Sequence, residues 1–146
     1  MNLADLLSHE PDARTLRLWL DKVPYACYLG IDAEVHGNEI LFILPRDKKL
    51  IGNPTLPAVH GGVVGAFMEQ AATFHLIAKM EEPVLPKIIN FSLDYLRPTR
   101  LRETYAQCTL TRQGRFIANI NITAWQEQSD RPNAIARAHF LIPDTT

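Results

Sequence analysis

The sequence predicts an α+β domain in which an antiparallel sheet packs against one dominant helix. Three observations support this class. A nearly continuous apolar run from about Gly62 to about Met80 has the length of a helix. Two short strand patterns precede this run, and four strand patterns follow it without interruption.

Composition and charge exclude several classes of protein and partner. The 146 residues suit a single domain, 1–146, and 47% hydrophobic with 21% charged residues is ordinary for a soluble globular protein. A formal net charge of -1 without a basic cluster argues against nucleic acid as a partner. No apolar run reaches the roughly 18 residues of a membrane span, and the N-terminus lacks the basic start and apolar stretch of a signal peptide. We therefore expect a cytoplasmic protein that does not bind membranes.

The cysteines and histidines show no spacing typical of a metal site. Cys27 and Cys108 lie far apart, so we interpret both as free thiols in a reducing compartment. The histidine within the long apolar run, His75, is interpreted as a packing or surface residue. The other histidines without a second ligand nearby are His9, His36 and His139. We expect no metal and no cofactor.

An N-terminal helical segment, 1–24, opens the domain. Apolar side chains recur at helical spacing at Leu16, Trp19, Leu20 and Val23. Asp12 is placed to cap this helix, and Pro24 is expected to end it.

A β-hairpin follows in the segment 28–45. It is expected to turn at Gly37–Asn38, a residue pair that tolerates positive φ. The residues from Arg46 to Gly62 contain several prolines and glycines and predict an irregular loop. This loop leads into the central helix, 62–80.

Alternation with a period of two replaces the helical pattern after Pro86. Residues 87–96 predict one strand, 103–128 a hairpin that bends at Gln113–Gly114, and 133–143 a last strand. The apolar faces of the last two strands consist of Ala118, Ile120, Ile122 and Ala124, and of Ala134, Ala136, Ala138, Phe140 and Ile142. Small residues on the central helix would let a curved sheet wrap closely around it: Gly65, Ala66, Ala71, Ala72 and Ala78.

Two glycines begin the central helix. The first backbone N–H groups of a helix lack intrahelical partners and carry the positive end of its dipole. Without side chains at Gly61 and Gly62, an electron-rich ligand atom could approach these amides, as in an oxyanion hole. The alternative is that the pair only permits a tight entry turn.

Glu69 is the only acidic residue of the central helix. No lysine or arginine shares its helical stripe, and a partly buried carboxylate without a partner is a candidate general base or nucleophile. The alternative is an ordinary solvent-facing glutamate. Glu69 follows Gly62 by seven residues, roughly 10 Å along the axis. It could serve a carbonyl held at Gly62 of a second chain if a two-fold axis ran the two helices past each other, and such a composite site implies a symmetric dimer.

The sequence "HGG", the acid nine residues after its histidine, and "INFSLDYLRP" resemble a known family. They are similar to the hotdog-fold thioesterases of the PaaI-like, phenylacetate-pathway type, and the resemblance spans nearly the whole chain. It implies a single hotdog domain with the sheet wrapped around the helix, and a homodimer with shared active sites, which could pair into a tetramer. The implied catalytic residues are Asn53, His60, Gly62 and Glu69, with His60 either contacting the thioester or shaping the glycine turn.

The resemblance also implies substrate-binding residues. Gly61 adjoins the polarising glycine, and Asn90 and Ser92 are the nearest polar groups to the position from which some members assist the attacking water. Basic residues are expected for the phosphates of coenzyme A (CoA), which is part of the substrate. The candidates are Arg97, Arg100 and Arg102, although such a run is also typical of a solvated edge.

The implied activity is hydrolysis of an acyl-CoA or aryl-CoA thioester to the free acid and CoA. Two alternatives remain. One is a hotdog-fold dehydratase or hydratase acting on hydroxyacyl thioesters, and the other is a non-catalytic module that binds acyl-CoA.

Overall fold

The computed structural model describes residues 12–144 of the chain. Its elements, in chain order, are α2 (Ala13–Asp21), α3 (Pro24–Leu29), β1 (Asp32–His36), β2 (Glu39–Leu44), the 3-10 helix η1 (Lys48–Leu50), β3 (Ile51–Asn53), β4 (Ala58–Val59), α4 (Gly61–Lys79), β5 (Lys87–Tyr95), β6 (Thr104–Gln113), β7 (Ile117–Trp125) and β8 (Ala134–Leu141).

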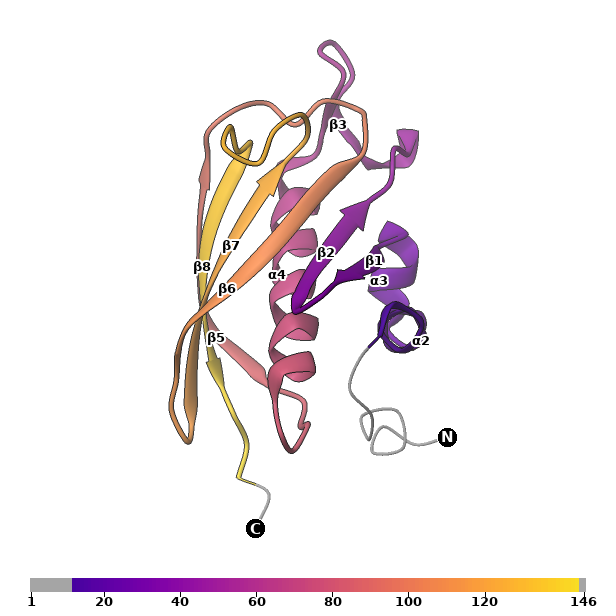
Figure 1. Cartoon of the computed structure of the whole chain (residues 1–146). Helices are drawn as coiled ribbons and strands as arrows, with labels where there is room; N and C mark the ends of the chain where they lie inside the picture. Colours follow the sequence, from indigo (N-terminus) through magenta and orange to yellow (C-terminus); the bar gives the residue numbers. More distant parts are fainter. Residues whose placement is uncertain (1–11, 145–146) are drawn as a thin grey trace.

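A six-stranded antiparallel sheet with the order β1-β2-β6-β7-β8-β5 curves around α4 (Figure 1). Strands β7 and β8 alternate between buried and more exposed residues, which places their apolar faces against the helix. These faces contain fully buried alanines such as Ala118 and Ala138, and Ala71 and Ala72 of α4 are buried in the same core cluster. Small side chains let helix and sheet approach closely, and the predicted hotdog architecture is confirmed.

The central helix begins at Gly61 and ends at Lys79, one residue earlier at each end than predicted. Its core positions include Phe67 and Met68, both fully buried. Because most of its surface is covered, the helix carries apolar residues almost all round, as expected for a helix inside a small domain.

The N-terminal region differs from the prediction at Pro24. Asp12 caps α2 as predicted, with its Oδ1 accepting a hydrogen bond from the Thr15 N–H at 2.8 Å. The helix ends at Asp21, however, and Pro24 begins a second short helix, α3. A proline at the first helical position loses no hydrogen bond, because that N–H has no intrahelical partner. The part of the predicted helical segment before Asp12 lies outside the described residues.

The loop predicted between Arg46 and Gly62 contains a small antiparallel pair, β3 with β4. Strands of three and two residues are too short to show a period in the sequence. The hairpin turn is confirmed at Gly37, whose φ is 63°.

Candidate active site

His60 closes the N-terminus of α4. Its Nδ1 accepts a hydrogen bond from the Gly62 N–H at 2.9 Å. Its backbone oxygen accepts from the Val63 and Val64 N–H groups at 2.9 and 3.2 Å, and its own N–H donates to Leu50 O at 2.8 Å. These bonds give His60 the capping geometry of the architectural alternative.

One amide at this end of the helix is left over. Gly62 N–H, the predicted polarising group, donates to the His60 ring. Gly61 N–H makes no hydrogen bond within residues 12–144. Gly61 N–H is therefore the unbonded amide of the glycine pair in the described structure, and Gly62 N–H is the bonded one.

Tyr95, at the end of β5, reaches this turn. Its hydroxyl donates to Gly61 O at 2.7 Å. The contact between Tyr95 and Gly61 was not predicted, although Tyr95 lies within the "DYLRP" stretch that supports the family resemblance. Only the fold brings it to a residue 34 positions earlier.

Glu69 lies two turns into α4 and is half-buried. Thr73, one turn further, donates its hydroxyl to the Glu69 backbone oxygen at 3.0 Å. Across the described part of the chain, no hydrogen bond or ion pair engages the Glu69 carboxylate. A separation of roughly 12 Å along the axis keeps this carboxylate from a carbonyl at Gly61 of the same chain.

Asn53 is exposed at the end of β3, and its Oδ1 accepts from the Thr55 N–H at 3.0 Å. The β3–β4 pairing places Asn53 opposite Ala58, two residues before His60. The close fit between these segments requires a glycine, because a Cβ at Gly52 would lie 2.6 Å from the His60 Cα. Asn53 and His60 are thus held in neighbouring segments at the same end of the molecule.

Asn90 and Ser92 lie on the opposite face of the sheet. They pair in register with His139 and Arg137, which are exposed on β8. The intervening Phe91 points toward α4, where its ring lies 3.9 Å from a Cβ built at Gly65. Within one protomer, the structure does not bring Asn90 and Ser92 to the end of α4.

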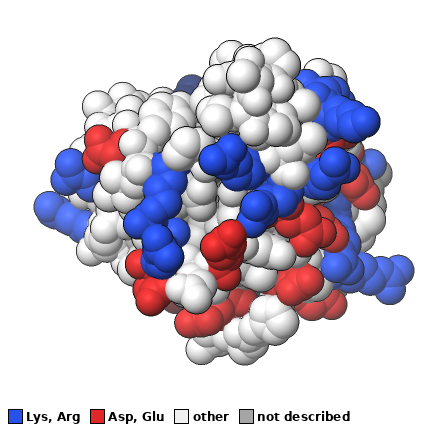
Figure 2. Space-filling view, turned by 90° about the horizontal axis from the view of Figure 1, so that it is seen from above, with Lys and Arg blue, Asp and Glu red and all other residues white. Residues whose placement is uncertain are grey.

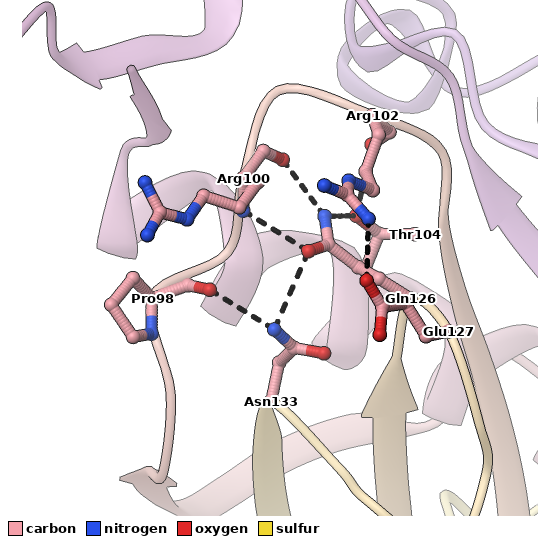
Figure 3. Close-up of polar contacts among 7 residues, drawn as sticks. All are labelled: Pro98, Arg100, Arg102, Thr104, Gln126, Glu127 and Asn133. Atoms are coloured by element: carbon pink, nitrogen blue, oxygen red, sulfur yellow. Dashed lines mark hydrogen bonds and ion pairs between the residues drawn. The ribbon is translucent and has the colours of Figure 1, made fainter. Parts of the chain in front are cut away.

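The arginine-bearing residues 97–102, named here the arginine segment, are anchored by side-chain amides (Figure 3). Gln126 accepts from Arg100 N–H at 3.1 Å, donates to Arg100 O at 2.8 Å and donates to Thr104 Oγ1 at 3.1 Å. Asn133 donates to Pro98 O at 3.1 Å and to Gln126 Oε1 at 3.4 Å. The segment is therefore fixed along its backbone.

The arginine segment also contacts the strand that leads to His60. Val59 N–H donates to Thr99 O at 2.7 Å, and Ala58 forms an isolated bridge with Arg100. A cavity of about 290 Å³ adjoins the segment, lined by Arg97, Pro98, Arg100, Arg102, Gln126, Glu127, Arg131 and Asn133. Arg131 was not predicted, because it lies in a turn 29 residues beyond Arg102.

The arginines differ in how far they are engaged. Arg102 pairs with Glu127 at 2.8 Å, while Arg97 and Arg100 each donate to a backbone carbonyl. Arg131 makes no side-chain bond within residues 12–144. Acidic side chains intersperse with basic ones over this end of the molecule (Figure 2), so the surface has no uniform charge.

Other polar groups lie apart from this end. His75 is buried, and its Nδ1 has no hydrogen-bond partner in the described structure. Burial lowers the pKa of His75 to about 4, with a smaller contribution from Lys79 one turn along the helix. Cys27 and Cys108 are free. Residues 12–144 contain no metal-binding group of three or more His, Cys, Asp or Glu, and none of their helices is long and apolar enough to cross a membrane.

The sheet wrapped around a central helix, with a glycine pair at the start of that helix, defines a hotdog-fold protein of the thioesterase type. The model of the thioesterase superfamily matches residues 56–132, more than half of the chain. The chain belongs to the thioesterase superfamily.

Solved structures are similar to the chain in fold. A protein from Chromobacterium violaceum is 40% identical, with 98% of this chain and 97% of that chain covered and a TM-score of 0.75. A thioesterase from Haemophilus influenzae is 22% identical, with 91% of each chain covered and a TM-score of 0.80. A phenylacetic acid degradation-related protein from Ralstonia eutropha is 22% identical, with 87% of this chain and 98% of that chain covered and a TM-score of 0.73. The last two likenesses show the fold. No curated protein sequence matched the chain.

Proposed function

We propose that the protein hydrolyses acyl-CoA or aryl-CoA thioesters to the free acid and CoA, as a PaaI-like member of its superfamily. One observation carries this proposal: a single helix presents an unbonded amide at its first residue and, two turns later, an unpaired carboxylate. A thioester needs little more, since its carbonyl is electrophilic and its thiolate leaves readily.

The amide of Gly61 would polarise the thioester carbonyl, because it is the free donor at this turn and Gly62 N–H is held by His60. Gly62 would serve only after the His60 ring moves aside. Asn53 would orient the attacking water or the carboxylate, and His60 would hold the turn. The phenylacetate-related structure supports an aromatic acyl group as one class of substrate to test.

Glu69 of the partner subunit would act as general base or as nucleophile. As a base, it takes a proton from water while the water oxygen adds to the carbonyl carbon. The C–S bond then breaks, and the thiolate receives the proton. As a nucleophile, the carboxylate oxygen adds to the carbonyl carbon, the C–S bond breaks and the CoA thiolate leaves. Water then hydrolyses the resulting anhydride, which releases the acid, restores the Glu69 carboxylate and supplies the proton that the thiolate takes up.

A homodimer would supply that partner carboxylate. Strand β5 is nine residues long and lies at the edge of the sheet. Apolar side chains remain exposed on it, with Ile89 at 55% and Tyr95 at 57%. A long exposed edge favours pairing with another strand, so we place the two-fold axis beside β5. Two such dimers could form a tetramer.

The cavity beside the arginine segment would receive the CoA phosphates. Arg97, Arg100 and Arg102 line it together with Arg131, whose side chain is not otherwise engaged. Guanidinium groups suit phosphate oxygens because they donate in a planar fork. Asn90 and Ser92 would reach a substrate only from another protomer.

A thiol-release assay over aliphatic and aromatic CoA esters tests the function. Wild type should release CoA, and Glu69→Gln should lower kcat by about 10² to 10⁴. Glu82→Gln, an exposed glutamate beyond the helix, is the matched control and should retain activity. Full activity in Glu69→Gln would remove this residue from the mechanism. Water addition to an enoyl-CoA without thiol release would identify a hydratase, and tight binding without either reaction would identify a binding module.

Shared sites can be tested by mixing subunits. Glu69→Gln and Asn53→Ala should each be inactive alone. If each site takes Glu69 from one chain and Asn53 from the other, one of the two sites in a mixed dimer keeps both residues. Mixed dimers should then recover up to half of the activity of the wild-type dimer. No recovery in verified mixed dimers would contradict a shared site.

A further inference from the structure

We propose that Tyr95 is a positioning residue, which together with His60 fixes the Gly61–Gly62 peptide group and so aims the free Gly61 amide at the substrate. The catalytic target of this inference rests on the proposed function. The clamp itself rests on contacts within one chain.

Both ends of a single peptide group are held by side chains. The carbonyl of Gly61 accepts the Tyr95 hydroxyl at 2.7 Å, and the N–H of the same peptide group, on Gly62, donates to His60 Nδ1 at 2.9 Å. One partner comes from the end of β5 and the other from the residue before the helix. Rotation of this peptide plane would break both bonds together.

The preceding peptide group is fixed at its carbonyl end. His60 O accepts from the Val63 and Val64 N–H groups. Of the four polar ends of these two consecutive groups, three are therefore bonded: His60 O, Gly61 O and Gly62 N–H. Only Gly61 N–H is left for a ligand. A donor held in this way stabilises a developing negative charge without reorganising during the reaction.

The two clamping side chains lie close to both glycines. A Cβ on Gly61 would lie 3.2 Å from the Tyr95 hydroxyl oxygen, and a Cβ on Gly62 would lie 3.0 Å from the His60 ring. Glycine is otherwise the residue with the most backbone freedom. The clamp removes this freedom at the point where a catalytic donor must be rigid.

The Tyr95 contact is one hydrogen bond, from a side chain that is 57% exposed within one protomer and would lie near the proposed dimer axis. Tyr95→Phe removes this bond while keeping the ring, so the fold of the protomer should be retained. Tyr105→Phe is the matched control, because Tyr105 bonds only to Glu103 on its own segment.

Two measurements test the proposal. The first is hydrogen exchange of the Gly62 amide, followed by NMR on the whole protein without substrate. The second is steady-state hydrolysis of whichever CoA ester wild type turns over. Tyr95→Phe should speed Gly62 exchange at least fivefold and lower kcat about tenfold, with KM changed less than twofold, as expected for loss of one hydrogen bond that aims a catalytic group. Tyr105→Phe should change neither.

The possible outcomes distinguish the clamp on the peptide group from its role in catalysis. Unchanged Gly62 exchange in Tyr95→Phe would overturn the clamp, whatever the activity. Faster exchange with unaltered kcat would overturn the positioning role. A rise in KM alone would show that Tyr95 contributes to substrate binding instead. If wild type hydrolyses no CoA thioester, the proposed function fails, and the exchange measurement still decides the clamp.

Discussion

Gln126 offers the sharpest test of how the arginine segment is held. Replacing Gln126 by alanine removes bonds to both the N–H and the carbonyl of Arg100, and also those to Thr104 and Asn133. The substitution touches none of the residues proposed to meet the reacting carbonyl. Any effect must therefore pass through the segment itself.

The magnitude follows from what each partner loses. Thr104 and Asn133 are buried at 0% and 7% exposure, but each keeps another hydrogen bond, to Arg102 O and Pro98 O respectively. The Arg100 backbone groups lie where water can replace the lost amide. Counting roughly 0.5–1 kcal/mol for each of the four bonds gives a loss of about 2–4 kcal/mol in the free energy of unfolding.

Urea unfolding measures this loss as a lower midpoint with an unchanged m value. If the arginines bind phosphate, KM for a CoA ester should rise about tenfold, while KM for the same acyl group on phosphate-free N-acetylcysteamine stays constant. Gln128→Ala, an exposed glutamine two residues on, is the control for both. A free energy of unfolding within about 0.5 kcal/mol of wild type would refute the reasoning.

Two further predictions concern groups near the central helix. His75 has a folded-state pKa of about 4, below its usual 6.5, so the unfolded chain binds more protons between these values and stability falls as the pH drops through this window. The loss in the free energy of unfolding should approach about 3 kcal/mol near pH 4. Unfolding measured at pH 4 and pH 7 should show a smaller loss in His75→Leu than in wild type. The same loss in both proteins would assign this pH dependence to other groups. Gly52→Ala places a Cβ 2.6 Å from the His60 Cα, so it should lower the free energy of unfolding by about 1–3 kcal/mol and reduce kcat. Gly37→Ala is the control, because a Cβ at Gly37 would have no atom within 4 Å whereas the φ of 63° strains the backbone. Equal effects of the two substitutions on kcat would argue against a role for the His60 contact.

Local patterns predicted most of the fold. Sequence periods and turn residues that span a few positions predicted the helix α4, the turn at Gly37 and the apolar faces of β7 and β8. The second helix at Pro24 was missed because proline either ends or begins a helix, and the sequence alone did not distinguish them.

The candidate site was less predictable, because it depends on register. A bulge in β5 between Ile88 and Asn90 shifts its pairing with β8 by one residue. Since side chains alternate across a sheet, this shift turns Asn90 and Ser92 away from α4 and turns Phe91 toward it.

By itself, the sequence determined the order of the elements, the long helix with its glycine start and its lone acid, and the family. These are properties of neighbouring residues, which share a backbone and obey local periodicity. Only the tertiary structure decided which amide of the glycine pair is free, that Tyr95 holds the turn, and that Arg131 joins the arginine segment. These contacts join residues far apart in the chain, and strand register and packing, rather than sequence spacing, set the distances between them.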